Sequence, residues 1–169
     1  MQTIDFFVAI AEIAGVFVGF GALISVTRRT KFEASQIGRI RAVVTIGLLV
    51  IIAALIPVVL RSYGFSEENL WFISSFLFLI LNLVLIILSL LRSENRVLLV
   101  AQSRANPLTA AFFWLLLEIP VQVPLILILV GSWQDLEPAF YSTALVFNLF
   151  EAAYVLAQLV YAQEISTKP

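Results

Sequence analysis

The sequence predicts an all-α fold, a polytopic transmembrane helix bundle of five spans. Three observations lead to this fold class: 62% of the residues are apolar, only 12% are charged, and the mean hydropathy is +1.05. These values lie far outside the usual range of soluble domains. We therefore expect residues 1–169 to form a single transmembrane domain in contact with the lipid bilayer.

Five apolar stretches each approach the length of about 20 residues that a helix needs to cross the hydrocarbon core. The first begins with Asp5 where a cleavable signal peptide would carry Lys or Arg, so we expect it to remain in the mature protein. Helix-start signals precede the third span, at Ser66 and Glu67, and the fourth, at Asn106 and Pro107. The predicted spans cover about residues 4–27, 41–60, 70–91, 108–130 and 139–161.

Charge asymmetry predicts the orientation of the bundle. Basic residues gather in two connections, about residues 28–40 and 92–107, whereas the second connection has only Arg61 and the fourth has none. Because cytoplasmic loops are enriched in Lys and Arg, both basic connections are predicted to be cytoplasmic, with the N-terminus outside and the C-terminus in the cytoplasm. Four aromatic residues fall near the expected outer boundary: Tyr63, Trp71, Trp133 and Tyr141.

The composition also argues against several function classes. The chain has no cysteine and no histidine, which removes disulfides, thiolate or imidazole metal sites, and Ser-His or Cys-His nucleophilic pairs. A net charge of -1 provides no broad basic surface for nucleic acid. We therefore predict no enzyme activity, no cofactor, no metal site and no nucleic-acid partner.

Three glutamates, Glu12, Glu118 and Glu151, lie inside apolar stretches that contain no Lys or Arg. An isolated ionised carboxylate in hydrocarbon is costly, so each must be protonated, bind a cation or face water. These residues therefore point toward protons or monovalent cations.

Other polar residues of the spans lie at a similar depth. The helical rise places Glu118 and Glu151 roughly 20 Å from the outer helix ends, and Glu12 about 12 Å. Alternatively, the polar side chains inside the spans form the interhelical hydrogen bonds that hold membrane bundles together. The predicted ion or proton pathway comprises Glu118, Glu151, Glu12, Asn82, Asn148 and Gln122.

The fourth span contains two prolines beside polar residues. Pro120 and Pro124 lack an amide hydrogen, so the carbonyls of Leu116 and Pro120 lose their usual donors, and the helix should bend or break. Freed carbonyls near Glu118 are similar to the broken-helix cation sites of secondary transporters. A simple proline kink is the alternative.

Small residues recur on the first span at Ala11, Gly15 and Gly19. Such a row lets another backbone approach closely, so this face is expected to pack against a neighbouring helix or a second subunit. The second span has only Thr45 as an interior polar residue and is predicted to be a packing or lipid-facing helix. Because one chain makes a narrow bundle, we expect a homo-oligomer.

The stretch IAEIAGVFVGFG at residues 10–21, the Arg-rich first connection and Leu55-Ile56-Pro57 resemble an uncharacterised group of small bacterial multi-pass inner-membrane proteins. The resemblance covers mainly the first third of the chain. It implies a location in the bacterial inner membrane and no particular chemistry.

Two functional hypotheses follow from the sequence. In the first, the midplane glutamates serve a proton or cation channel or transporter. In the second, the chain is a non-transporting membrane scaffold or assembly subunit whose glutamates are protonated and structural.

Overall fold

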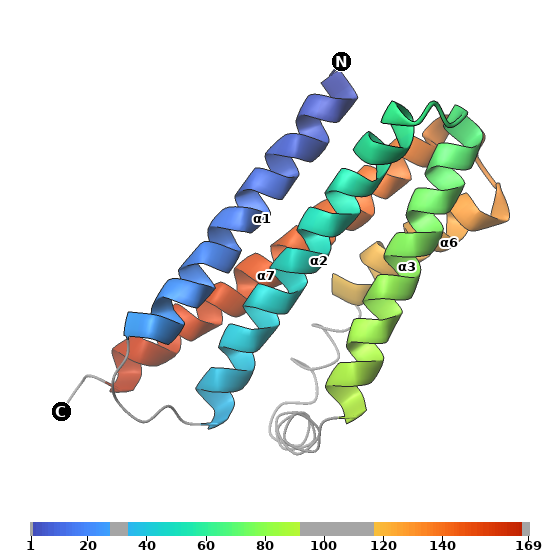
Figure 1. Cartoon of the computed structure of the whole chain (residues 1–169). Coiled ribbons are helices and arrows are strands. Elements are labelled where there is room, and N and C mark those ends of the chain that lie inside the picture. The colour runs from blue at the N-terminus through green and yellow to red at the C-terminus, as the bar shows by residue number, and fades with distance from the viewer. Residues whose placement is uncertain (1, 28–33, 92–116, 167–169) are drawn as a thin grey trace.

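The computed structural model describes residues 2–27, 34–91 and 117–166 (Figure 1). The regular structure of these residues is entirely helical, without strands. In chain order the elements are α1 (Gln2–Thr27), α2 (Ala34–Ser62), α3 (Glu67–Leu91), α6 (Ile119–Val130), a short 3-10 helix η2 (Gln134–Leu136) and α7 (Glu137–Ser166).

Four helices are long and apolar enough to cross a membrane, over Ile4–Val26, Ile37–Ser62, Glu67–Leu91 and Gln134–Val160. The shorter apolar helix α6 covers the second half of the predicted fourth span. The beginning of that span, its start signal at Asn106 and Pro107, and the connection 92–107 lie outside the described residues. The all-helical class is confirmed, and the four long apolar helices fit the predicted membrane class. The described residues form five α-helices, a count that fits the predicted number of spans, while the orientation stays a prediction.

Consecutive helices run in opposite directions, so the N-terminus and the α2–α3 and α6–α7 turns lie at one end of the bundle (Figure 1). We call this the turn end. Gly64 and Gly131 have positive φ angles of 80° and 70°, a conformation that glycine adopts without the steric cost of a Cβ atom. The Gly131 amide donates to the Ile128 carbonyl at 3.0 Å and closes α6. Because consecutive helices alternate in direction, α1, α3 and α7 begin at the turn end and run away from it.

Helix α2 occupies the centre of the bundle and packs against α1, α3 and α7. Most of its buried residues are small or β-branched, as at Val43, Val50, Ala53 and Ala54, and Leu49 adds a larger side chain to the core. Of the two predictions for this span, the packing helix is the one observed.

Glycine lets α1 and α2 approach closely, at Gly47 and Gly21. A Cβ atom on Gly47 would lie 2.6 Å from Cγ2 of Val18 and 3.4 Å from the Ala14 carbonyl oxygen. By contrast, a Cβ atom on Gly15 or Gly19 would meet nothing within 4 Å. Of the predicted packing row, only Ala11 packs against the core, and the two glycines leave open the alternative of a second subunit.

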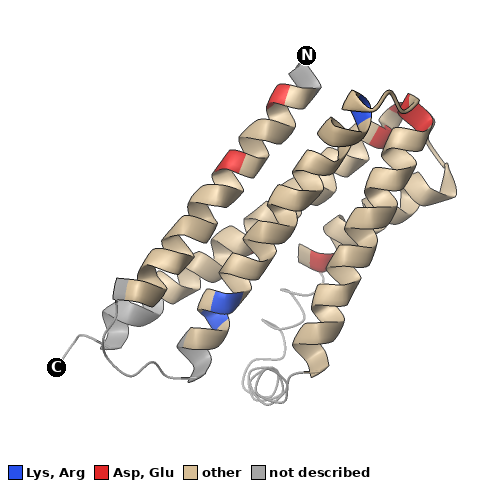
Figure 2. Cartoon of the chain, in the orientation of Figure 1, with Lys and Arg blue, Asp and Glu red and all other residues tan. Residues whose placement is uncertain are grey.

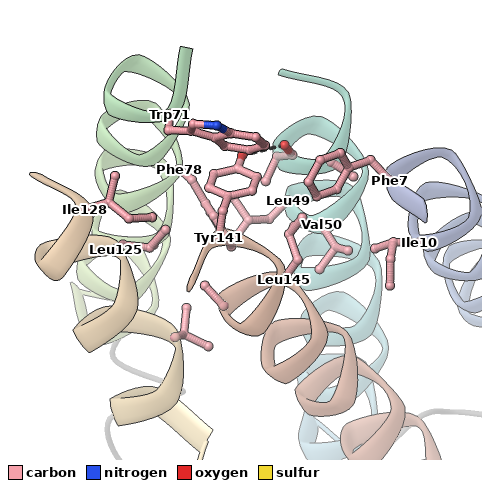
Figure 3. Packing of buried hydrophobic residues seen from close by; sticks show 14 of the residues in the cluster. Phe7, Ile10, Leu49, Val50, Trp71, Phe78, Leu125, Ile128, Tyr141 and Leu145 are labelled. Atoms are coloured by element: carbon pink, nitrogen blue, oxygen red, sulfur yellow. Dashed lines mark hydrogen bonds between the residues drawn. The ribbon is translucent and has the colours of Figure 1, made fainter. Parts of the chain in front are cut away.

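The core toward the turn end is aromatic (Figure 3). We call Phe7, Trp71, Phe78 and Tyr141 the aromatic cluster, because their side chains from α1, α3 and α7 contact one another. Trp71 and Tyr141 are only 4% and 0% exposed, so their rings pack inside the bundle instead of facing the lipid headgroups, while their predicted depth near the outer boundary stays a prediction. The hydrophobic core supplies a well-packed alternative for their large rings.

Tyr63 and Trp133 are 79% and 56% exposed near the turns at that end. Their exposure agrees with the position that amphipathic rings take at a membrane interface.

Candidate functional site

Helix α3 buries polar side chains on the face that meets α7. Ser75 and Asn82 lie on the same stripe as Trp71 and Phe78, since these residues follow one another at intervals of three or four. The rings of Trp71 and Phe78 both contact Tyr141 of α7, with centroids 5.8 Å apart in each pair. The stripe, including Ser75 and Asn82, is therefore directed toward α7.

Helix α7 carries a matching amide. Asn148 follows Tyr141 by two helical turns and is 1% exposed, while Asn82 follows Ser75 by two turns and is 5% exposed. Because α3 and α7 run in the same direction and Tyr141 lies level with the residues around Ser75, the two asparagines lie at about the same depth. The structure thus brings together two residues of the predicted pathway from different helices.

Several buried polar atoms in this region have no hydrogen-bond partner within the described chain. A buried donor or acceptor left without a partner costs about 1–3 kcal/mol, and natural structures hold few of them. Helices α3, α6 and α7 all contribute such atoms: Ser74 Oγ, Ser75 Oγ, Asn82 Nδ2, Gln122 Nε2, and both Oδ1 and Nδ2 of Asn148. We call these five residues, together with Glu118 and Glu151, the polar cluster.

Two carboxyl groups complete the polar cluster. Glu118 directly precedes α6, Glu151 lies on α7, and both side chains are partly buried. Helix α6 packs against α7, and the two carboxyl groups lie at about the same depth along these helices. Gln122, one turn after Glu118, interacts with its carboxyl group, although Gln122 Nε2 makes no hydrogen bond of ordinary geometry.

The basic residues that the structure describes lie away from this cluster, toward the two ends of α2 (Figure 2). Arg61 pairs with Glu67 at 2.8 Å near the turn end. At the opposite end, Arg39 donates to the Gln158 carbonyl at 3.4 Å. Within the described residues, therefore, Glu118 and Glu151 have no neighbouring base to balance their charge.

Glu12 is not brought together with the other predicted pathway residues. Asp5, Glu12 and Gly19 share one exposed face of α1, and α1 packs mainly on α2 and α7. In the isolated chain this face points away from the core. Both the outward rotation of this face and the position of α1, which packs on α2 and α7 instead of α6, separate Glu12 from Glu118 despite their similar predicted depth.

The two prolines differ in their effect on α6. The α-helix begins at Ile119 with Pro120 in its first turn, and it directly follows Leu117 and Glu118 in π-helical conformation, so the helix is locally distorted just before Pro120. Pro124 lies inside the helix, which continues to Val130, so the predicted break does not occur at Pro124. The Pro120 carbonyl still faces a residue without an amide hydrogen, and Leu116 lies outside the described residues.

Two members of the polar cluster, Ser75 and Ser74, are absent from the predicted pathway, and Ser74 has the clearer sequence signal. It sits between Leu70 and Phe78 at intervals of four residues, both of them buried. Those two apolar neighbours on its own helix face were the available signal.

Chemically, the polar cluster offers unpaired donors and acceptors next to two carboxyl groups. Among the described residues there is no group of three or more acidic side chains placed to hold a metal ion. Comparisons of the chain with protein-family models, curated proteins and solved structures find no match.

Proposed function

We propose that the protein conducts protons or monovalent cations across the membrane through the polar cluster between α3, α6 and α7. The observation that carries the proposal is the set of buried, unpaired polar atoms on three helices. Such atoms are costly in an apolar core, so a bundle held together by packing alone would gain stability by replacing them. Water satisfies both the donors and the acceptors among them, whereas a passing cation binds only the acceptors.

The mixture of groups favours a hydrated path. Asn148 has both an unpaired donor and an unpaired acceptor, a combination that water fulfils and a bare cation does not. Glu118 and Glu151 lie at about the same depth at the junction of α6 and α7, two helices that pack together. One carboxyl group can then release a proton or bind a cation while the other is protonated, which avoids placing two charges side by side.

Reconstituted liposomes provide the test. We expect proton, Na⁺ or K⁺ flux from the wild-type protein, and a loss of that flux in the double variant Glu118→Gln, Glu151→Gln. Glutamine retains the size and much of the hydrogen bonding but cannot carry charge. Equal flux from the two proteins would overturn the proposal.

A matched control removes two carboxylates outside the cluster, in the double variant Glu68→Gln, Asp135→Asn. Both residues are exposed near the turn end. Flux is expected to remain at the wild-type level. A loss equal to that of the cluster variant would show that flux follows overall charge instead of the polar cluster.

The membrane scaffold remains the second candidate because of the exposed face of α1. Glu12 lies on this face between apolar neighbours, and Gly15 and Gly19 leave open space beside it. A second copy packing there would bring two backbones close together and shield the carboxyl group. We therefore propose a homo-oligomer that assembles through α1 in the bacterial inner membrane.

Cysteine cross-linking tests the oligomer, since the natural chain has no cysteine. Gly19→Cys is expected to form disulfide-linked dimers in membranes, whereas Ile80→Cys on the exposed face of α3 is not. Equal cross-linking at the two positions would indicate random collision. Stable dimers together with an absence of flux would favour the scaffold over transport.

Single cysteines also test the proposed orientation. The N-terminus outside and a cytoplasmic C-terminus predict that an impermeant thiol reagent added to intact cells labels Tyr63→Cys and spares Arg41→Cys. The reverse pattern would invert the topology.

A further inference from the structure

The two ends of the bundle differ in the sign of their charge. The charged residues of the turn end are the acidic Asp5, Glu67, Glu68, Asp135 and Glu137 and one basic residue, Arg61. By their position in the chain, all other basic residues belong to the opposite end, in the first turns of α2, in the connections 28–33 and 92–107, and after α7. We call this opposite end the basic end.

Two arginines near the start of α2 point to opposite sides of the helix. Arg39 and Arg41 are two residues apart, which corresponds to a rotation of about 200°. Arg39 is half-buried and donates to an α7 carbonyl at 3.4 Å. The same face of α2 meets α7 again at Ala53, whose carbonyl lacks a helical donor because of Pro57 and accepts from the Tyr141 hydroxyl group at 2.6 Å. Arg41 is therefore turned away from α7.

Arg41 begins an exposed apolar stripe of α2. Leu48 and Leu55 follow it at intervals of seven residues, with Ile52 one turn after Leu48, and all three are exposed. On a membrane-spanning helix, such a surface contacts lipid acyl chains, which are as apolar as leucine. The helical rise from Arg41 to Leu55 is about 21 Å, which exceeds half of the hydrocarbon core of about 30 Å. The stripe is thus long enough for a lipid of one leaflet.

Arg41 has no ionic partner on the described protein surface. No salt bridge joins it to a carboxylate whose side chain the structure describes, whereas Arg61 at the other end of α2 pairs with Glu67 at 2.8 Å. A guanidinium group keeps its charge and offers five N–H donors. Long basic side chains at helix ends extend to the level of the lipid headgroups. A lipid phosphate is therefore the anion within reach of Arg41.

We propose that an anionic phospholipid binds at the basic end of α2, with its phosphate against Arg41 and its acyl chains along Leu48, Ile52 and Leu55. The positive charge of the basic end favours an anionic lipid over a zwitterionic one. This surface is separate from the polar cluster between α3, α6 and α7. The proposal therefore holds or fails independently of transport.

Fluorescence quenching tests which lipid contacts the stripe. In the cysteine-free chain, a fluorophore on Leu48→Cys is quenched in vesicles by brominated phosphatidylglycerol or brominated phosphatidylcholine. We expect phosphatidylglycerol to bind about fivefold or more tightly, and Arg41→Gln to lower this preference about fivefold, because a basic residue near an anionic surface contributes about 1 kcal/mol. An equal preference with and without Arg41 would overturn the proposal.

Two controls separate this site from a general attraction of anionic lipid. Arg61→Gln removes the arginine at the other end of the same helix and should leave the preference at Leu48→Cys unchanged. A fluorophore on Ile80→Cys, on the exposed face of α3, should show no preference. A loss in Arg61→Gln equal to that in Arg41→Gln, or an equal preference at Ile80→Cys, would overturn the proposal.

Arg41→Lys provides a second variant that keeps the positive charge. The preference should persist, and a loss equal to that of Arg41→Gln would contradict a charge-based site. Excess inorganic phosphate, compared with chloride at the same ionic strength, distinguishes a lipid from a soluble anion. Quenching by phosphatidylglycerol should not change, because phosphate lacks the acyl chains. Displacement of the lipid by phosphate would identify a soluble anion as the occupant and overturn the proposal.

Discussion

The α1–α2 pair and the α3–α6–α7 group are packed by different means. Between α1 and α2, glycine brings the backbones together and apolar side chains fill the interface, as at Gly47 against Val18. Among α3, α6 and α7, amide and hydroxyl groups are buried without partners. The interface between α1 and α2 is thus apolar and closely packed. The interface among α3, α6 and α7 instead contains polar groups that are able to bind different hydrogen-bond partners.

Tyr141 connects these two regions. It belongs to α7, contacts Phe7 of α1 through its ring, and bonds to α2 through its hydroxyl group. Tyr141 therefore contacts both groups of helices. The contrast between the two regions predicts different responses to substitution, ordered below by the expected change in the free energy of unfolding.

The largest effect is expected from Gly47→Val. A Cβ atom alone would come within 2.6 Å of Val18 Cγ2, and overpacking of this kind typically costs about 1–3 kcal/mol. Unfolding in mixed detergent micelles measures the change. Gly15→Val is the matched control on α1, where the added atoms meet open space, and no loss of monomer stability is expected. Similar losses in the two variants would refute the close α1–α2 approach.

The next effect concerns the hydrogen bond between Tyr141 and the Ala53 carbonyl. Tyr141→Phe is expected to cost about 0.6–1.7 kcal/mol, the range of interhelical hydrogen bonds in membranes. In a Pro57→Ala background the cost should fall by at least half, because the new amide at position 57 can serve the same carbonyl.

A double-mutant cycle over the four proteins measures this coupling. The exposed Tyr63→Phe provides the control and should leave stability unchanged in both backgrounds. Equal costs of Tyr141→Phe with and without Pro57 would mean that the proline does not create the need for the tyrosine.

The sequence predicted the helical content of both regions better than their contacts. Apolar length and the signals at Ser66 and Glu67 placed the third helix within three residues of its observed start. The rotation of each helix was not predictable in the same way. Depth along the axis placed Glu12 with Glu118, but only the direction of the α1 face reveals that they are apart.

The packing residues show the same limitation. The row of small residues at Gly15 and Gly19 indicates that a backbone could approach α1. The observed close approach instead uses Gly47 of α2, which belongs to no such row in the sequence analysis. Tyrosine also satisfies two environments equally well, a membrane boundary or a buried hydrogen bond. The choice for Tyr141 depends on Pro57, a residue 84 positions earlier in the chain.

Asn148→Leu should change stability by less than about 1 kcal/mol and abolish flux. If water satisfies the amide, replacing it with an apolar side chain loses as much as it gains, whereas in a dry core the same substitution would stabilise by about 1–3 kcal/mol. Chemical unfolding and liposome flux give the two readouts. A full stabilisation with unchanged flux would identify the polar cluster as dry and structural.

The control for this substitution makes the opposite exchange one turn earlier on α7. Leu145 is 0% exposed in the apolar core, so Leu145→Asn is expected to destabilise by more than about 2 kcal/mol. If asparagine is tolerated at Leu145, polar groups are accepted anywhere on the buried face of α7. The distinction between the α1–α2 pair and the α3–α6–α7 group would then be lost.

The smallest change in the free energy of unfolding is expected at the ion pair that links α2 to α3 at the turn end. Arg61 and Glu67 lie 2.8 Å apart, but their side chains are 46% and 63% exposed, so water and salt screen most of their attraction. Glu67→Gln should therefore lower stability by less than about 0.5 kcal/mol, and raising the salt concentration should abolish even that difference from wild type. A larger, salt-resistant loss would mean that the α2–α3 turn is held by this pair. Because Gly64 already closes the turn through backbone bonds, the ion pair is expected to stabilise a geometry that exists without it.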